Sequence, residues 1–163
     1  MIPVISVVGK SNSGKTTYLE KLIRELKSRG WRVGTIKHHH TPNIEVDQPG
    51  KDTWRHAQAG ADVVAIACPN KVAVIEHLAE ELPMEQVIAK ITGVDIIITE
   101  GYKGGNKPKI EVFRQGVHAG LVSKTEDLIA IVSDVTFNLG VPSFDLEETK
   151  AVADLIEQRF LHK

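Results

Sequence analysis

The sequence predicts a three-layer α/β fold with a mostly parallel sheet and a β-hairpin at one edge, formed as one domain over residues 1–163. Apolar, β-prone runs alternate with amphipathic helical patterns, the order of elements in α/β domains with right-handed crossovers. The run "VDIIITEG" is continuously apolar, as in a strand buried on both faces of a parallel sheet. Two other apolar runs flank a Pro-Asn pair, which is a hairpin signal.

The first elements are a strand, a helix and a second strand. A strand is predicted over Ile2–Val8, and Lys15–Arg29 places apolar residues at helical spacing before Gly30, a helix stop signal. The segment "WRVGTIKH" is typical of a strand. The polar segment Thr41–Lys51 contains two prolines and is predicted to be a long loop. Such loops inside compact domains are usually functional or mobile.

The rest of the chain continues the alternation. A short helix is predicted over Asp52–Ala59, followed by the hairpin "DVVAIACPNKVAVIEH", in which we expect Cys68 to be a buried small hydrophobic residue. Helical residues over Met84–Ile91 lead into "VDIIITEG". The segments "KIEVFR" and "DLIAIVSD" are predicted strands, and "LEETKAVADLIEQRFL" is an amphipathic helix after Pro142.

The composition indicates a compact chain without a strong overall charge. Lys+Arg 20 nearly balances Asp+Glu 21, so neither nucleic acid nor a membrane surface is a predicted partner. Any acidic ligand must therefore be met locally. The single cysteine excludes an internal disulfide, a secretory signal is not recognisable, and no apolar run approaches the ~20 residues needed to cross a bilayer. We expect a cytoplasmic protein.

A phosphate-binding loop is the clearest motif. Gly9, four residues, Gly14, Lys15 and Thr16 match G-x-x-x-x-G-K-[ST], between a predicted strand and a predicted helix. The backbone N–H groups of such a loop and the helix N-terminus attract an anion. Lys15 is expected to reach the β/γ-phosphates, and Thr16 offers a hydroxyl to Mg²⁺. The motif makes the expected fold P-loop NTPase-like; the alternative is a plain glycine turn.

Strand direction selects the acidic partner of this loop. Ligands gather at the carboxyl ends of parallel strands. Asp95 begins the "IIIT" strand and Glu100 ends it, roughly 16 Å apart at ~3.3 Å per residue. Glu100 is therefore the predicted acid near Mg²⁺, bound directly or through water, with a solvated strand-end carboxylate as the alternative. By the same edge rule Lys37, His38 and Asp134 point towards the site.

Two other groups have competing interpretations. His38, His39 and His40 suggest zinc, but adjacent histidines diverge in an extended chain, so polar or phosphate contacts are favoured. Asp52 follows the long loop, where a carboxylate could position water or metal once nucleotide orders the segment, and helix N-capping is an equal alternative.

The residues alone leave the base open between ATP and GTP. The segment most similar to a guanine-specific N/T-K-x-D motif is "SKTED" (123–127). It precedes its strand and therefore lies at the amino edge of the sheet, opposite the expected ligand site. Asp134 lies at the correct edge, where its carboxylate could accept hydrogen bonds from guanine.

Four segments together resemble the MobB family, the molybdopterin-guanine dinucleotide biosynthesis protein B group: "GKSNSGKTT", "TIKHHH", "DQPGKDTWRHAQAGAD" and "IIITEGYK". The resemblance implies a GTP-binding, weakly hydrolytic, homodimeric protein that assists the MobA-type guanylyltransferase, which attaches GMP to molybdopterin. Molybdopterin itself is a further candidate partner. It also implies accessory roles for Lys37, His38, Asp47, Asp52 and Arg55. Lys10 matches a second loop lysine that reaches across the dimer in wider relatives, although Ser11 and Asn12 replace their paired glycines.

We therefore predict slow, Mg²⁺-dependent GTP hydrolysis with three catalytic residues, Lys15, Asp52 and Glu100, and two metal ligands, Thr16 and Glu100. The nucleotide-binding residues are Gly9, Lys10, Ser11, Asn12, Ser13, Gly14, Lys15, Thr16, Thr17, Lys37, His38 and Asp134. The alternatives are a nucleotide-switched adaptor without significant hydrolysis and a small-molecule or nucleotide kinase. The hairpin segment Val63–Ile75 is either a dimer surface or an ordinary buried sheet edge.

Overall fold

The computed structural model describes residues 1–42, 44–117 and 119–162, which form two compact units. The first unit comprises Met1–His39 and Ile88–Lys163, and the second comprises His40–Val87. Helix α3 (Met84–Ala89) runs across the boundary between them. The organisation of residues 1–163 as one domain stays a prediction.

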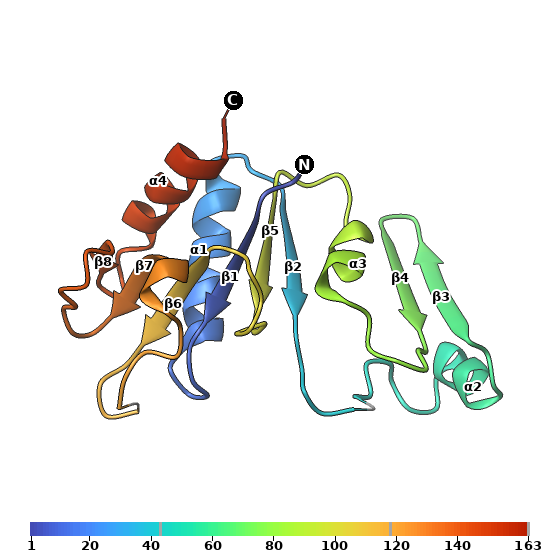
Figure 1. Ribbon diagram of the computed structural model, residues 1–163. Coiled ribbons are helices and arrows are strands. Elements are labelled where there is room, and N and C mark those ends of the chain that lie inside the picture. The colour runs from blue at the N-terminus through green and yellow to red at the C-terminus, as the bar shows by residue number, and fades with distance from the viewer. Residues whose placement is uncertain (43, 118, 163) are drawn as a thin grey trace. The chain divides into compact units, whose positions relative to one another are not determined.

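The first unit is built on a six-stranded sheet in the order β2-β5-β1-β6-β7-β8 (Figure 1). Every neighbouring pair is parallel, so the carboxyl ends of all the strands share one edge. Strand β1, with the glycine turn after it, is central, between β5 and β6. The strands are β1 (Val4–Val8), β2 (Val33–Lys37), β5 (Ile96–Glu100), β6 (Lys109–Phe113), β7 (Leu128–Ser133) and β8 (Ser143–Phe144).

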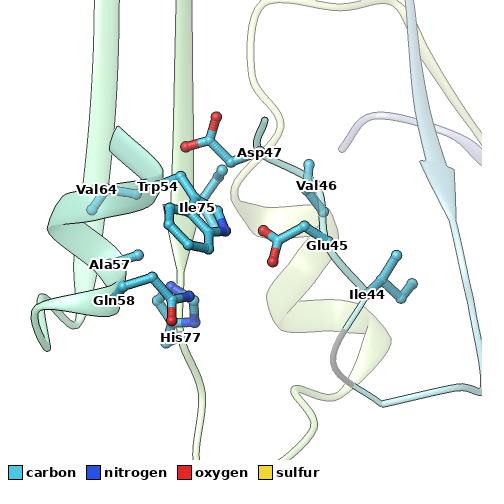
Figure 2. A pocket seen from close by; sticks show the side chains of 10 residues that line it. All are labelled: Ile44, Glu45, Val46, Asp47, Trp54, Ala57, Gln58, Val64, Ile75 and His77. Atoms are coloured by element: carbon cyan, nitrogen blue, oxygen red, sulfur yellow. The ribbon is translucent and has the colours of Figure 1, made fainter. Parts of the chain in front are cut away.

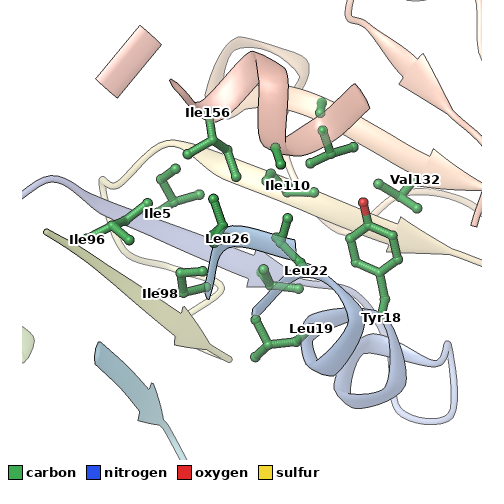
Figure 3. Packing of buried hydrophobic residues seen from close by; sticks show 14 of the residues in the cluster. Ile5, Tyr18, Leu19, Leu22, Leu26, Ile96, Ile98, Ile110, Val132 and Ile156 are labelled. Atoms are coloured by element: carbon green, nitrogen blue, oxygen red, sulfur yellow. The ribbon is translucent and has the colours of Figure 1, made fainter. Parts of the chain in front are cut away.

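Two helices, α1 (Lys15–Ser28) and α4 (Thr149–Phe160), contribute to one hydrophobic core with alternate residues of the strands (Figure 3). The fully buried members include Ile5, Leu22, Leu26, Ile110 and Ile156. Burying each such side chain contributes about 1.5–3 kcal/mol. This core fixes α1, and with it the turn that joins α1 to β1.

The other face of the sheet carries buried polar side chains with assigned partners. Glu111 is fully buried and accepts hydrogen bonds from the backbone N–H groups of Val122 (2.6 Å) and Ser123 (2.9 Å). Lys109 pairs with Asp127 at 2.9 Å. Asp127 ends the 3-10 turn η1 (Thr125–Asp127), so "SKTED" does precede its strand. These contacts hold residues 122–127 against β6.

The second unit consists of α2 (Asp52–Gln58) and an antiparallel hairpin of β3 (Val63–Cys68) and β4 (Lys71–Glu76). Val64 is buried, whereas Val63, Ile66, Val72 and Val74 are all more than half exposed.

Cys68 is exposed, which contradicts its expected burial. The reason is that β3 and β4 form a separate two-stranded sheet, so an apolar strand residue near the turn has no layer to cover it.

The predicted class, an α/β fold with a mostly parallel sheet and a β-hairpin, is confirmed. In the described ranges, no helix combines the length and the apolar character that a membrane span requires.

Candidate functional site

The turn between β1 and α1 has a backbone that depends on glycine. Gly9 has φ 144° and Gly14 has φ 89°, both in the region that favours glycine. A Cβ on Gly9 would lie 2.4 Å from the Val112 carbonyl oxygen and 2.9 Å from Ser13 Oγ. The chain therefore turns back sharply against β6, which leaves the next residues curled at the carboxyl edge of the sheet.

The curled turn leaves polar groups available for a ligand. Ser13 is fully buried, and its Oγ has no hydrogen-bond partner within the part of the chain that the structure describes. Helix α1 begins after Gly14 without a side-chain cap and without an acidic residue in its first turn. The first backbone N–H groups of a helix need acceptors, and a phosphate supplies them. An orphaned hydroxyl and an uncapped helix start both fit an anion.

Glu100 lies beside the start of α1. Thr16 Oγ1 donates a hydrogen bond to Glu100 Oε1 at 2.9 Å, and Lys37 Nζ contacts the same oxygen. Asp95, at the opposite end of this strand, pairs instead with Arg32 at 2.9 Å. The structure thus brings Thr16, Lys37 and Glu100 together, as strand direction indicates; their roles towards nucleotide and metal stay predictions.

The charges near Lys15 are mainly positive. Burial lowers the pKa of the Lys15 ammonium below its ordinary value; nearby Lys37 and Lys103 lower this pKa further, and Glu100 opposes them. Lys15 Nζ meanwhile donates to the Lys10 carbonyl oxygen at 2.5 Å. Because Lys37 and Lys103 add positive charge near Lys15, an incoming anion gains attraction here although the whole chain carries a net charge of -1.

Arg114 is a basic residue that the sequence reasoning missed. Its Nη2 lies 3.5 Å from the position that a Cβ on Gly14 would occupy. Arg114 directly follows β6, the neighbour of β1 in the sheet. Arg114 therefore lies at the carboxyl edge of the sheet, like Glu100 and Asp134, and the same rule could have selected it.

His38 packs against the residues after Glu100. Its backbone N–H donates to the Glu100 carbonyl oxygen at 2.9 Å, and its ring stacks on Tyr102 with centroids 4.4 Å apart. Gly101 permits this approach, since a Cβ there would lie 3.1 Å from His38 Cβ. Among the residues the structure describes, no three His, Cys, Asp or Glu side chains gather as a metal site, so the zinc interpretation gains no support.

Asp134 follows β7 at the carboxyl edge, as predicted. Its Oδ1 accepts a hydrogen bond from the backbone N–H of Gln115 at 2.8 Å, which ties the ends of β6 and β7 together. Whether this carboxylate contacts a base stays a prediction.

Asp47, Asp52 and Arg55 belong to the second unit. Asp52 is the first residue of α2, and Lys51 holds the N-cap position, so N-capping by Asp52 is not observed. An acidic residue in the first turn still interacts favourably with the helix dipole. The predicted roles of these three residues towards the nucleotide stay predictions.

A strand, a glycine turn and a helix on a parallel sheet, with an acid ending the adjacent strand, define a P-loop NTPase-like protein. The family model described as "MobB: Molybdopterin guanine dinucleotide synthesis protein B" matches residues 4–134. The chain belongs to this family.

Relatives and solved structures agree with the family match. A molybdopterin-guanine dinucleotide biosynthesis adapter protein of Haemophilus influenzae is 34% identical and covers 99% of this chain and 91% of its own. The Escherichia coli protein of the same name is 36% identical, with 96% and 92% covered. The crystal structure of Bacillus subtilis MobB superposes with a TM-score of 0.80 at 26% identity, covering 99% of this chain and 100% of that one.

Proposed function

We propose that this chain binds GTP and Mg²⁺ and acts as an adapter in the formation of molybdopterin guanine dinucleotide. The adapter role is supported by family membership and by the names of the two curated relatives. The nucleotide role is supported above all by one observation, the hydrogen bond from Thr16 to the buried Glu100 at the start of α1. A hydroxyl and a carboxylate beside an anion site are suitable ligands for Mg²⁺.

The proposed site has separate residues for the phosphates, for Mg²⁺ and for the attacking water. The backbone N–H groups of the turn, Ser13 Oγ and Lys15 hold the β/γ-phosphates, and Arg114 adds a further cation. Thr16 and Glu100 hold Mg²⁺, which supplies neutralisation of phosphate charge when bound. Asp52 or a loop histidine orients the attacking water.

Hydrolysis in this proposal is slow. A missing arginine finger alone is worth about 10³-fold or more in rate. The candidate sources of this group are Arg55 and a partner protein. The adaptor without hydrolysis and the kinase are the alternatives, and phosphate release measured over many turnovers, with and without an acceptor or partner enzyme, separates the three.

Glu100→Gln tests the metal role. Replacing the charged ligand is expected to remove most of the Mg²⁺ dependence of GTP affinity, because the neutral amide attracts the cation far less. Calorimetric titrations with Mg²⁺ and with a chelator measure that dependence.

Asp95→Asn is the matched control, because it removes a carboxylate from the other end of the same strand. The control should keep the wild-type Mg²⁺ effect. Equal Mg²⁺ effects in wild type and Glu100→Gln would exclude Glu100 from the metal site.

Asp134→Asn tests base selection. A carboxylate that pairs with the guanine N1–H and amino group should favour GTP, and its amide should bind xanthosine triphosphate relatively better by about tenfold. Competition between the two nucleotides measures this ratio. An unchanged ratio would remove Asp134 from the base site.

The partners follow from the same proposal. We expect a cytoplasmic homodimer that engages a MobA-type guanylyltransferase, with molybdopterin as a further candidate partner. The proposed dimer surface is the hairpin, because Val63, Val72 and Val74 are exposed apolar residues. Covering them with a second copy of the chain would remove apolar surface from water, which favours association.

A further inference from the structure

The second unit contains a cavity that the proposed nucleotide site does not use. It has a volume of about 240 Å³ and lies between α2, the hairpin and the segment that precedes α2. Figure 2 shows Trp54 in the middle of the lining residues, with Asp47 towards one end and Gln58 and His77 towards the other. The lining residues are Ile44, Glu45, Val46, Asp47, Trp54, Ala57, Gln58, Val64, Ile75 and His77.

Two polar atoms in this lining are buried and have no hydrogen-bond partner among residues 1–42, 44–117 and 119–162. They are Asp47 Oδ2, which is an acceptor, and Trp54 Nε1, which is a donor. Asp47 Oδ1 accepts from the Gln48 backbone N–H at 2.8 Å, so the carboxylate is held in place while its second oxygen stays available. Buried polar groups normally find partners, because leaving them unpaired costs free energy. The pair therefore indicates a ligand that both donates and accepts.

The walls indicate a flat ligand. Val64 and Ile75 are cross-strand partners in the hairpin, and both line the cavity together with the Trp54 indole and Ala57. An apolar and aromatic lining with a few polar groups is the usual composition of a small-molecule site. The volume is below the ~300–1,000 Å³ typical of drug-sized ligands, which suits a single bicyclic ring.

The charge of the cavity excludes the phosphate end of a ligand. Glu45 and Asp47 both line it, and neither lysine nor arginine does among the lining residues. Two carboxylates repel a phosphate but attract neighbouring N–H donors.

We propose that this cavity binds a bicyclic ring through a 2-amino-4-oxopyrimidine edge, and that the ring is the pterin of molybdopterin. The ring N3–H and the 2-amino group donate to Asp47, the 4-oxo oxygen or a ring nitrogen accepts from Trp54 Nε1–H, and the ring faces pack on Val64 and Ile75. Guanine carries the same edge, but the proposed function already assigns guanine to Asp134. The choice of pterin rests on that proposed function.

The test observes Trp54 directly. The chain has two tryptophans, so a ¹⁵N spectrum contains two indole N–H signals, and the signal that disappears in Trp54→Phe belongs to Trp54. Titration of the full chain with 6-hydroxymethylpterin should shift the Trp54 signal and leave that of Trp31 in place. Asp47→Asn should weaken binding by about tenfold or more. Glu80→Gln, which removes a carboxylate outside the lining, should not change it.

Two further ligands identify the chemistry. Lumazine, which has an oxygen in place of the 2-amino group, should bind at least about tenfold more weakly than the pterin. Equal affinities for lumazine and pterin, or a Trp54 signal that pterin does not move, would overturn the site. Guanosine that binds more tightly than pterin would overturn the assignment to pterin. GTP titrated onto Asp47→Asn reports the phosphate loop separately, so failure of the cavity and failure of the nucleotide site are distinguishable.

Discussion

Replacing Lys15 with alanine is expected to weaken GTP binding by about 30-fold to several thousand-fold. The ammonium is partly desolvated, and other cations surround it, so a triphosphate is its natural partner. Removing one member of such a charge pair typically costs about 2–5 kcal/mol, and each 1.4 kcal/mol is about tenfold in affinity. Calorimetric titration of GTP in the presence of Mg²⁺ measures the loss.

The fold should survive this change, because the Lys15 ammonium donates to the nearby Lys10 carbonyl oxygen and is not among the residues that form the hydrophobic core. Lys27→Ala is the matched control, since it removes an exposed lysine from the last turn of the same helix. A Lys15→Ala variant that retains wild-type affinity would refute the phosphate-loop assignment.

Gly9→Ala is expected to lower the free energy of unfolding by about 2–5 kcal/mol. The methyl group would meet the Val112 carbonyl oxygen at 2.4 Å, and φ 144° is a strained conformation for any residue with a Cβ. Backbone strain and overpacking each cost about 1–3 kcal/mol. The carbonyl belongs to a central strand, so it yields only if β6 moves. Urea denaturation followed by circular dichroism measures the change.

Gly104→Ala provides the comparison, because a Cβ there has open space and the φ of Gly104 lies outside the strained region. That variant should unfold within about 0.5 kcal/mol of wild type. If both alanine variants unfolded at the same urea concentration, the close packing of the turn against β6 would be wrong.

The elements of the first unit are predictable from the sequence, because the patterns that indicate them lie within short segments of the chain. The strand "IIIT" is continuously apolar, and the observed β5 is buried at every residue. The direction of that strand distinguishes Glu100 from Asp95, and the structure places Thr16 beside Glu100 and Arg32 beside Asp95.

What the sequence did not predict depends on contacts between distant segments. Strand β8 has only two residues, too few for a period-2 pattern, and it exists because Pro142 and Phe144 lie beside β7. Cys68 has an apolar sequence context, and its exposure follows from the hairpin being a sheet of its own. Arg114 ends a predicted strand, but its closeness to Gly14 depends on β6 lying beside β1, which the spacing of motifs does not provide.

The segment "DQPGKD" combines a turn that the sequence predicts with a buried carboxylate that it does not predict. Its glycine and proline predict a turn before α2, and α2 does begin at Asp52. One oxygen of Asp47 accepts a hydrogen bond from the next residue, and the other is buried in the cavity. The spacing of residues in the sequence does not indicate this second position. Burial without a partner is visible only in three dimensions, and it is the property on which the proposed pterin site depends.

In the proposed function, a nucleotide bound to the loop over residues 9–17 controls the binding of this adapter to its partner enzyme. The most direct test of this control is the affinity of the purified chain for a MobA-type guanylyltransferase, measured with a non-hydrolysable GTP analogue and Mg²⁺, with GDP, and without nucleotide. We predict binding at least about tenfold tighter with the GTP analogue, a coupling of about 1.4 kcal/mol or more. Equal affinity in all three states would contradict the account.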